Sequence, residues 1–245
     1  MMKVKKFKIA HLYYDLMNLY GENGNVRYLV KQLERQGIDA EVHFLSMEEK
    51  IDFKKYDFYY IGMGSEENKM IVLDNIMKYK EDIIEAVNNN KYFLVTGNAI
   101  DLFGEHIVML DNKKIPTLDV FDYEIKEEDF RIVGEQYYEI DLDIKENKII
   151  GFQNRNTVLE IDDTEHLFNV IKGTGNKPNS EIEGIKCNKF YGTYLLGPIL
   201  VRNPYFTDYL VKDICDSLDV KFKADTDGMA YKAYHEYIKN FHGEQ

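Results

Sequence analysis

The sequence predicts an α/β protein built on a mostly parallel sheet, and three features support this fold class. Apolar runs rich in β-branched and aromatic residues alternate with segments whose apolar residues recur at helical spacing. The early apolar runs stop at turns rich in glycine or asparagine. From about residue 105 to 173, short alternating segments separated by polar turns predict additional antiparallel hairpins.

The first elements form a strand–helix–strand unit. A strand is expected over 7–14, and a second over 40–45. Between them, Asn25 is expected to cap a helix that ends at Gly37. The apolar positions of this helix recur at helical spacing: Val26, Leu29, Val30 and Leu33. This order favours a right-handed parallel crossover.

The next two strands are expected over 57–61 and 91–96. The first runs directly into Gly62-Met63-Gly64-Ser65, and the second into a sharp turn followed by a helix. The helix between these strands has a stripe that indicates a core-facing side: Met70, Leu73, Met77, Ile84 and Val87.

The C-terminal part is expected to add a strand over 189–196 that Gly197-Pro198 breaks. Asn203 and Pro204 then read as the cap and first position of a helix. A last helix is expected from about Asp225 to Phe241. We therefore expect a single domain over 1–245, with an antiparallel insertion at about 105–173 and C-terminal helices at about 204–242.

Composition limits the class of partner. The 245-residue chain carries 31 basic and 43 acidic residues, a net charge of -12, which opposes attraction to nucleic acid and to anionic membranes. No apolar run approaches the roughly 20 residues that cross a bilayer, and no signal peptide is evident. We expect a cytoplasmic protein without nucleic-acid or membrane partners.

The two cysteines, Cys187 and Cys215, have no metal-ligand neighbour at short spacing. They are interpreted as structural and reduced, and no metal or cofactor is expected. Candidate chemistry instead lies at strand ends near Thr96, because these ends line the ligand crevice of parallel sheets. Gly62 and Gly64 let backbone amides approach an oxyanion, although both turns are also compatible with ordinary chain reversal.

Five stretches resemble the cobyric acid synthase-like (CobB/CobQ-like) class I glutamine amidotransferases: Asn18–Asn25, Ile61–Ser65, Val95–Asn98, Gly151–Asn154 and Gly192–Leu200. The resemblance is strongest to glutaminase subunits of lipid II isoglutaminyl synthases. It implies a flavodoxin-like sheet flanked by helices with extra antiparallel strands. It also implies glutamine hydrolysis by a cysteine and a histidine, with ammonia passed to a synthetase partner that resembles a Mur ligase.

The chain departs from the family at both essential places. The resemblance matches Thr96 with the nucleophilic cysteine and Leu196 with the histidine, and it makes the elbow segment one residue longer than in the family. A β-branched residue such as Thr96 is poorly suited to the positive φ common at a nucleophile elbow. The resemblance implies surviving ligand-binding positions at Gly62, Met63, Gly64, Gly97, Asn98 and Arg131.

Three functional hypotheses follow. The leading one is a catalytically degenerate binding or scaffold subunit, attached to a Mur-ligase-like synthetase. The alternative is an active glutamine or related amide hydrolase that uses Thr96 or Asp101, with His106 as a candidate base, and supplies ammonia to such a partner. The third is a sensor that binds glutamine or another amino-acid-like ligand without turnover. Cobalamin synthesis, cell-wall amidation and other pathways stay open as destinations.

Overall fold

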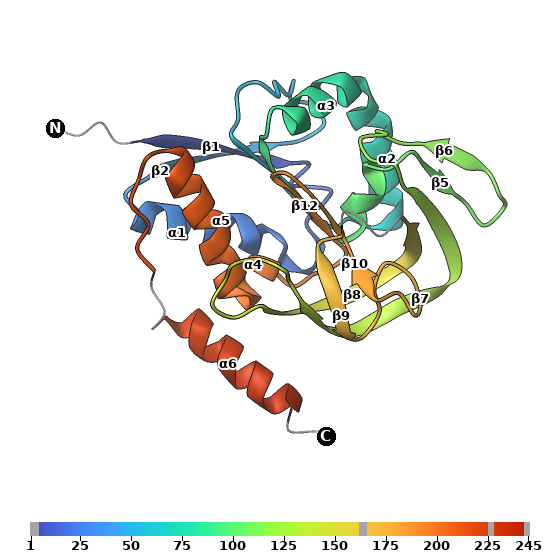
Figure 1. Cartoon of the computed structure of the whole chain (residues 1–245). Helices are drawn as coiled ribbons and strands as arrows, with labels where there is room; N and C mark the ends of the chain where they lie inside the picture. The colour runs from blue at the N-terminus through green and yellow to red at the C-terminus, as the bar shows by residue number, and fades with distance from the viewer. Residues whose placement is uncertain (1–4, 162–165, 225–227, 243–245) are drawn as a thin grey trace.

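A computed structural model describes residues 5–161, 166–224 and 228–242, and these residues form two six-stranded sheets with helices around them (Figure 1). In the first sheet the strand order is β11-β12-β4-β3-β1-β2. Its strands are β1 (Lys6–Leu12), β2 (Asp39–Leu45), β3 (Phe58–Ile61), β4 (Tyr92–Thr96), β11 (Ile185–Cys187) and β12 (Phe190–Thr193). All neighbouring pairs are parallel except β11 with β12.

The order β2-β1-β3-β4 is that of a flavodoxin-like sheet. The chain leaves β1 toward β2 and then returns to the other side of β1 to form β3, so the strand order reverses between β1 and β3. In open α/β sheets such a switch point opens a crevice at the carboxyl ends of the strands.

Helices cover both faces of this sheet (Figure 1). The helices of the described residues are α1 (Asn23–Arg35), α2 (Glu66–Ile76), α3 (Lys80–Asn88), α4 (Ile199–Arg202), α5 (Pro204–Ser217) and α6 (Met229–His242), with 3₁₀ turns η1 (Leu19–Gly21), η2 (Met77–Tyr79) and η3 (Gly97–Leu102). Of these, α6 lies away from the first sheet and packs on a small cluster of its own (Figure 1). Apolar side chains of α1 and α5 pack on one face, and those of α2 and α3 pack on the other. The strand residues alternate between these two cores, as a sheet buried on both sides requires.

The second sheet has the order β10-β9-β7-β5-β6, with β8 also paired to β7. Its strands are β5 (His106–Val108), β6 (Lys114–Pro116), β7 (Glu124–Glu139), β8 (Lys148–Glu160), β9 (Phe168–Lys172) and β10 (Ile182–Glu183). An antiparallel bridge between Phe152 and Leu196 joins β8 to the segment after β12. The second sheet thereby contacts the carboxyl edge of the first.

Several local expectations were wrong. The stripe predicted between β3 and β4 belongs to two helices that η2 separates, and Met70, Met77 and Ile84 are only partly buried. The core positions there are Val72, Leu73, Ile76, Ile83, Ala86 and Val87. The segment after Thr96 is a 3₁₀ turn and not an α-helix. Tertiary packing decides these details, which periodicity alone does not resolve.

Two predicted caps form other bonds. Asn25 lies inside α1, where its carboxamide donates to the Tyr60 hydroxyl at 3.0 Å and accepts from the Leu200 amide at 2.9 Å. Asn203 does precede α5, but its carboxamide bonds both the amide and the carbonyl of Ile150 at 2.8 Å. Both side chains therefore tie separate segments together. The predicted start of the last helix, at Asp225, lies outside the described residues.

Candidate functional site at the carboxyl edge of the first sheet

The turn after β4 contains the backbone torsion typical of a nucleophile elbow, but one residue later than expected. Thr96 is extended, with φ -122° and ψ 150°. Gly97 has φ +63°, in the left-handed region that glycine adopts without strain. The elbow torsion therefore falls on Gly97.

Gly97 faces the residue that matches the family histidine. A Cβ atom built on Gly97 would lie 2.5 Å from the Met63 Cβ and 2.7 Å from the Leu196 Cδ2. Met63 and Leu196 are both buried. A side chain at position 97 would thus point toward residue 196, but the space it needs is filled.

Thr96 belongs to a separate buried polar cluster. Its hydroxyl is hydrogen-bonded to the Glu22 carboxyl and lies 2.9 Å from the Tyr60 hydroxyl. Glu22 also accepts from the Gly197 amide at 3.1 Å. All three side chains are completely buried, and burial raises the pKa of Glu22 although its hydrogen bonds oppose that rise. The cluster joins the start of α1 to β3, β4 and the segment after β12.

The glycine loop has internal partners for its polar groups. The Gly64 amide donates to the Asn98 Oδ1 at 3.1 Å, and the Asn98 Nδ2 donates to the Gly64 carbonyl at 2.9 Å. The Met63 carbonyl accepts from the Leu19 amide at 2.9 Å. At Gly62, an added Cβ would lie 2.9 Å from the Met17 carbonyl. The Gly64 amide that the sequence suggested for an oxyanion is thus held by Asn98.

Asp101 is part of a buried ion pair. The Lys69 Nζ lies 2.6 Å from its Oδ2, and both side chains are buried. The Tyr194 hydroxyl donates to Asp101 at 2.8 Å, and the Thr157 hydroxyl donates at 3.1 Å. The carboxylate is therefore neutralised and fully bonded, as a structural ion pair requires.

Arg131 lies at the rim of the site. Its guanidinium donates to Glu66 at 2.6 Å and to the Asn154 Oδ1 at 3.1 and 2.9 Å. The Asn154 Nδ2 in turn donates to the Tyr20 hydroxyl at 2.6 Å. Arg131 is half-exposed and connects the second sheet to the start of α2.

The structure does not bring His106 to the elbow. Its Nε2 lies 2.7 Å from a Glu124 carboxylate oxygen in the second sheet, while Thr96 and Asp101 bond the other groups described above. Cys215 is buried in α5, where burial raises its pKa to about 11. Cys187 lies in β11 at the sheet edge.

Sequence reasoning missed Glu22, Tyr60 and Lys69. Glu22 lies within Asn18–Asn25, one of the stretches that resemble the family. That resemblance was the signal that could have pointed to Glu22 as a site residue. Lys69 lies in α2 among apolar residues. A lysine in a helix is expected to face solvent, and only the fold shows that Asp101 is its buried partner.

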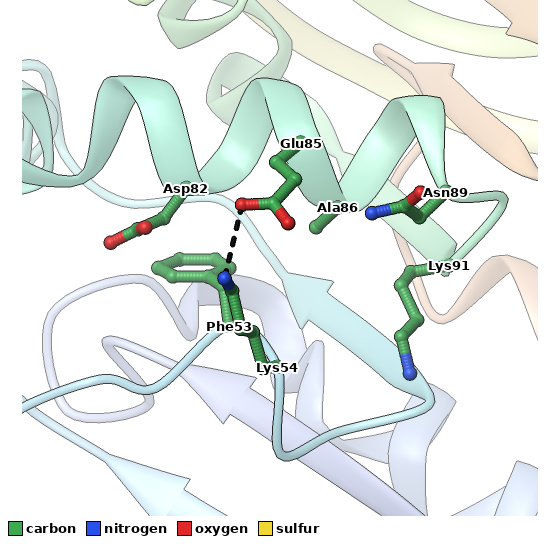
Figure 2. Close-up of a pocket in the computed structure, with 7 residues that line it drawn as sticks. All are labelled: Phe53, Lys54, Asp82, Glu85, Ala86, Asn89 and Lys91. Carbon is green, nitrogen blue, oxygen red and sulfur yellow. Dashed lines mark ion pairs between the residues drawn. The ribbon is translucent and has the colours of Figure 1, made fainter.

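The cavity at this site is small, and a larger cavity lies away from the site. Lys69 and Thr157 line a cavity of about 30 Å³. A cavity of about 300 Å³ lies between α3 and the Phe53-Lys54 loop (Figure 2). There the Lys54 ammonium reaches across to Glu85, while Asn89 and Lys91 lie toward the other end. Lys91 precedes β4, so this cavity is at the opposite edge from the elbow.

Two further features are absent from the described residues. No group of three or more His, Cys, Asp or Glu side chains there is arranged to hold a metal ion. None of the helices in the same part of the chain is both long and apolar enough to span a membrane.

A glycine loop, an elbow turn and the end of a late strand meet at one edge of this flavodoxin-like sheet. This is the arrangement of class I glutamine amidotransferases. The chain belongs to the CobB/CobQ-like glutamine amidotransferase domain family, whose model matches residues 8–204.

Relatives and a solved structure agree with this family. The chain is 30% identical over 247 residues to the GatD subunit of the glutamine-hydrolysing lipid II isoglutaminyl synthase of Streptococcus pneumoniae, covering 90% of this chain and 94% of the relative. It is 28% identical over 215 residues to the corresponding Staphylococcus aureus subunit, covering 88% and 87%. A Thermotoga maritima glutamine amidotransferase structure has the same fold, with a TM-score of 0.54 and 14% identity over 97% of this chain and 94% of that one.

Proposed function

We propose that this chain is a catalytically degenerate amidotransferase subunit that acts in binding or scaffolding within a synthetase complex. The observation that carries the proposal is the elbow itself. Its left-handed residue is Gly97, which has no side chain, and Met63 and Leu196 occupy the space where a thiol and an imidazole would meet. Covalent amide hydrolysis needs a nucleophile with a base in hydrogen-bond reach, and neither stands there.

We further propose that Gly97, and not Thr96 as the sequence suggested, holds the nucleophile position of the family. Two arguments support this assignment. Position 97 has the elbow torsion, and its missing side chain would point at Leu196, the position matched with the histidine. Thr96 points instead into the Glu22 cluster.

One observation favours the alternative, an amide hydrolase that uses Thr96. The Glu22 carboxyl is hydrogen-bonded to the Thr96 hydroxyl, so a base stands beside a nucleophile. Both groups are fully buried, however, and a substrate would need the turn to open. We therefore rank this function second.

The named relatives support a proposal about the partner and the pathway of this chain. They are subunits of a lipid II isoglutaminyl synthase, and the chain aligns with them over most of its length. We propose that it binds a synthetase subunit resembling a Mur ligase and has its place in cell-wall amidation. In a complex of this kind a degenerate subunit holds the synthetase fold in place without supplying ammonia.

The test is ammonia release from glutamine by four purified proteins. The first is the native chain, and the second is the Thr96→Ala variant. The other two combine Leu196→His and Met63→Gly with a new cysteine, either Gly97→Cys or Thr96→Cys. Met63→Gly is included because an added Cβ at position 97 would collide with the Met63 Cβ.

We expect no release from the native chain, and we expect activity gained with Gly97→Cys to exceed that with Thr96→Cys. Release by the native chain that disappears in Thr96→Ala would overturn the degenerate function and establish the threonine hydrolase. Greater activity with Thr96→Cys would overturn the assignment of Gly97. Thermal unfolding of each variant verifies that all four proteins are folded.

A further inference from the structure

A fully buried histidine near the carboxyl end of β1 has no hydrogen-bond partner. Neither ring nitrogen of His11 is bonded to any described residue, and the side chain has 0% exposure. A buried polar group without a partner loses its hydration without compensation, so such groups are rare and point to an absent partner. Burial lowers the pKa of His11 to about 4, so the ring is neutral and offers one donor and one acceptor.

Three aromatic rings surround this imidazole. We call His11 and these rings the His11 enclosure; the ring centroids of Tyr60, Phe44 and Tyr14 lie 5.0, 5.6 and 6.3 Å from that of His11. Tyr60 is buried, and its hydroxyl is already bonded to the Glu22 cluster. Tyr14 is 39% exposed and Phe44 is 51% exposed. Their ring centroids lie 5.4 Å apart. These two rings, which we call the cover, lie between His11 and solvent.

The position of the enclosure in the fold is that of a ligand crevice. His11 pairs with Tyr60 in the register of β1 with β3, between which the strand order reverses. Tyr14 of the cover follows β1 closely, whereas Phe44 lies in β2. Tyr13, between Leu12 and Tyr14, has φ +49°. A bulky aromatic residue in the left-handed region is strained, and such strain gathers at functional sites.

We propose that the His11 enclosure binds a neutral carboxamide carried on an aromatic or other apolar group. A carboxamide can bond either ring nitrogen of a neutral imidazole, because its oxygen accepts from the N–H and its nitrogen donates to the unprotonated nitrogen. The apolar body would take the place of the Phe44 ring against Tyr14 and Tyr60 when Phe44 turns outward. A carboxylate is disfavoured because Glu22, which is bonded to Tyr60, already places an acidic group beside the enclosure.

The enclosure lies beside the elbow and shares Tyr60 with the Glu22 cluster. The Gly97 position faces Met63 and Leu196 instead. Binding at His11 is measured without ammonia release, so its outcome is distinguished from that of the hydrolysis test.

The test uses benzamide as the probe, with ethylbenzene and benzoate as matched compounds that lack the amide or carry a charge. Binding is followed by the side-chain nitrogen resonances of His11 in the full-length protein, assigned through His11→Leu, and in every variant, His11→Leu included, by the backbone amide resonances of Tyr14 and Tyr60. The variants are His11→Leu, which removes the hydrogen bonds, and Phe44→Ala, which removes half of the cover. His43→Leu is the control, because His43 lies on the neighbouring strand with its ring against Tyr56.

We expect saturable shifts of the His11 resonances with benzamide and at least tenfold weaker binding of ethylbenzene and benzoate. Phe44→Ala should bind benzamide more tightly, His11→Leu at least tenfold more weakly, and His43→Leu as the native chain does. Equal binding of ethylbenzene, or no shift in both the native protein and Phe44→Ala, overturns the proposal. These two comparisons do not depend on the folding of His11→Leu.

Discussion

At the scale of a single residue, Glu183 makes stability depend on pH. It is completely buried, accepts from the Tyr194 amide at 2.7 Å and from the Thr193 hydroxyl at 2.8 Å, and burial raises its pKa from 4.5 to about 7. Between these values the native state holds a proton that the unfolded chain has lost. Its contribution to stability is complete below pH 4.5 and is lost as the pH rises through 7.

We therefore expect the native protein to lose on the order of 3 kcal/mol relative to Glu183→Gln between those two pH values. Urea unfolding of both proteins at several pH values measures the difference, since other titrating groups cancel. Glu34→Gln, on the exposed side of α1, is the control and should follow the native protein. If the unfolding free energies of the native protein and Glu183→Gln change in parallel with pH, Glu183 has an ordinary pKa.

At the scale of elements, the buried Lys69–Asp101 pair connects α2 to η3. Replacing Lys69 by Met leaves the Asp101 carboxylate buried without a cation, so unfolding free energy should fall by about 3–5 kcal/mol. The double variant Lys69→Met, Asp101→Leu should recover most of this loss, because it buries no charge. Urea unfolding measures each value.

The exposed pair between Lys54 and Glu85 is the matched control, with a distance of 3.4 Å. Lys54→Met should cost less than about 1 kcal/mol, because water screens and solvates that pair. Equal costs for Lys69→Met and Lys54→Met would mean that the Lys69–Asp101 pair does not hold the elements together.

At the scale of the whole molecule, α6 is attached through a small cluster of its own and not through either of the two large cores. It lies at the edge of the molecule (Figure 1) and packs Tyr231 and Tyr234 on a small cluster with Tyr137, Ile150 and Tyr205. Elements with few buried contacts open locally at lower free energy than a central strand. We expect amides of α6 to exchange with solvent hydrogen at a lower opening free energy than those of β4.

Two substitutions make this a test by native-state hydrogen exchange. Tyr231→Ala should lower the opening free energy of α6 and leave that of β4 unchanged. Phe206→Ala, in the main core, should lower both, by about 3–5 kcal/mol for β4. If Tyr231→Ala lowers the value for β4 as much as that for α6, the helix unfolds only with the whole molecule.

Strands β1 to β4, helices α1 and α5, and the family could be predicted from the amino-acid sequence, because hydrophobic period and local motifs are properties of neighbouring residues. The sequence also contained a reason for the proposal about the elbow, since glycine adopts a positive φ that a threonine resists. Which side chains meet was evident only from the fold. Thr96 bonds Glu22, 74 residues away, and Asp101 bonds Lys69, 32 residues away. Such contacts depend on strand order and burial, which no local pattern encodes. Because of them, the elbow region is a filled core whose polar groups bond one another.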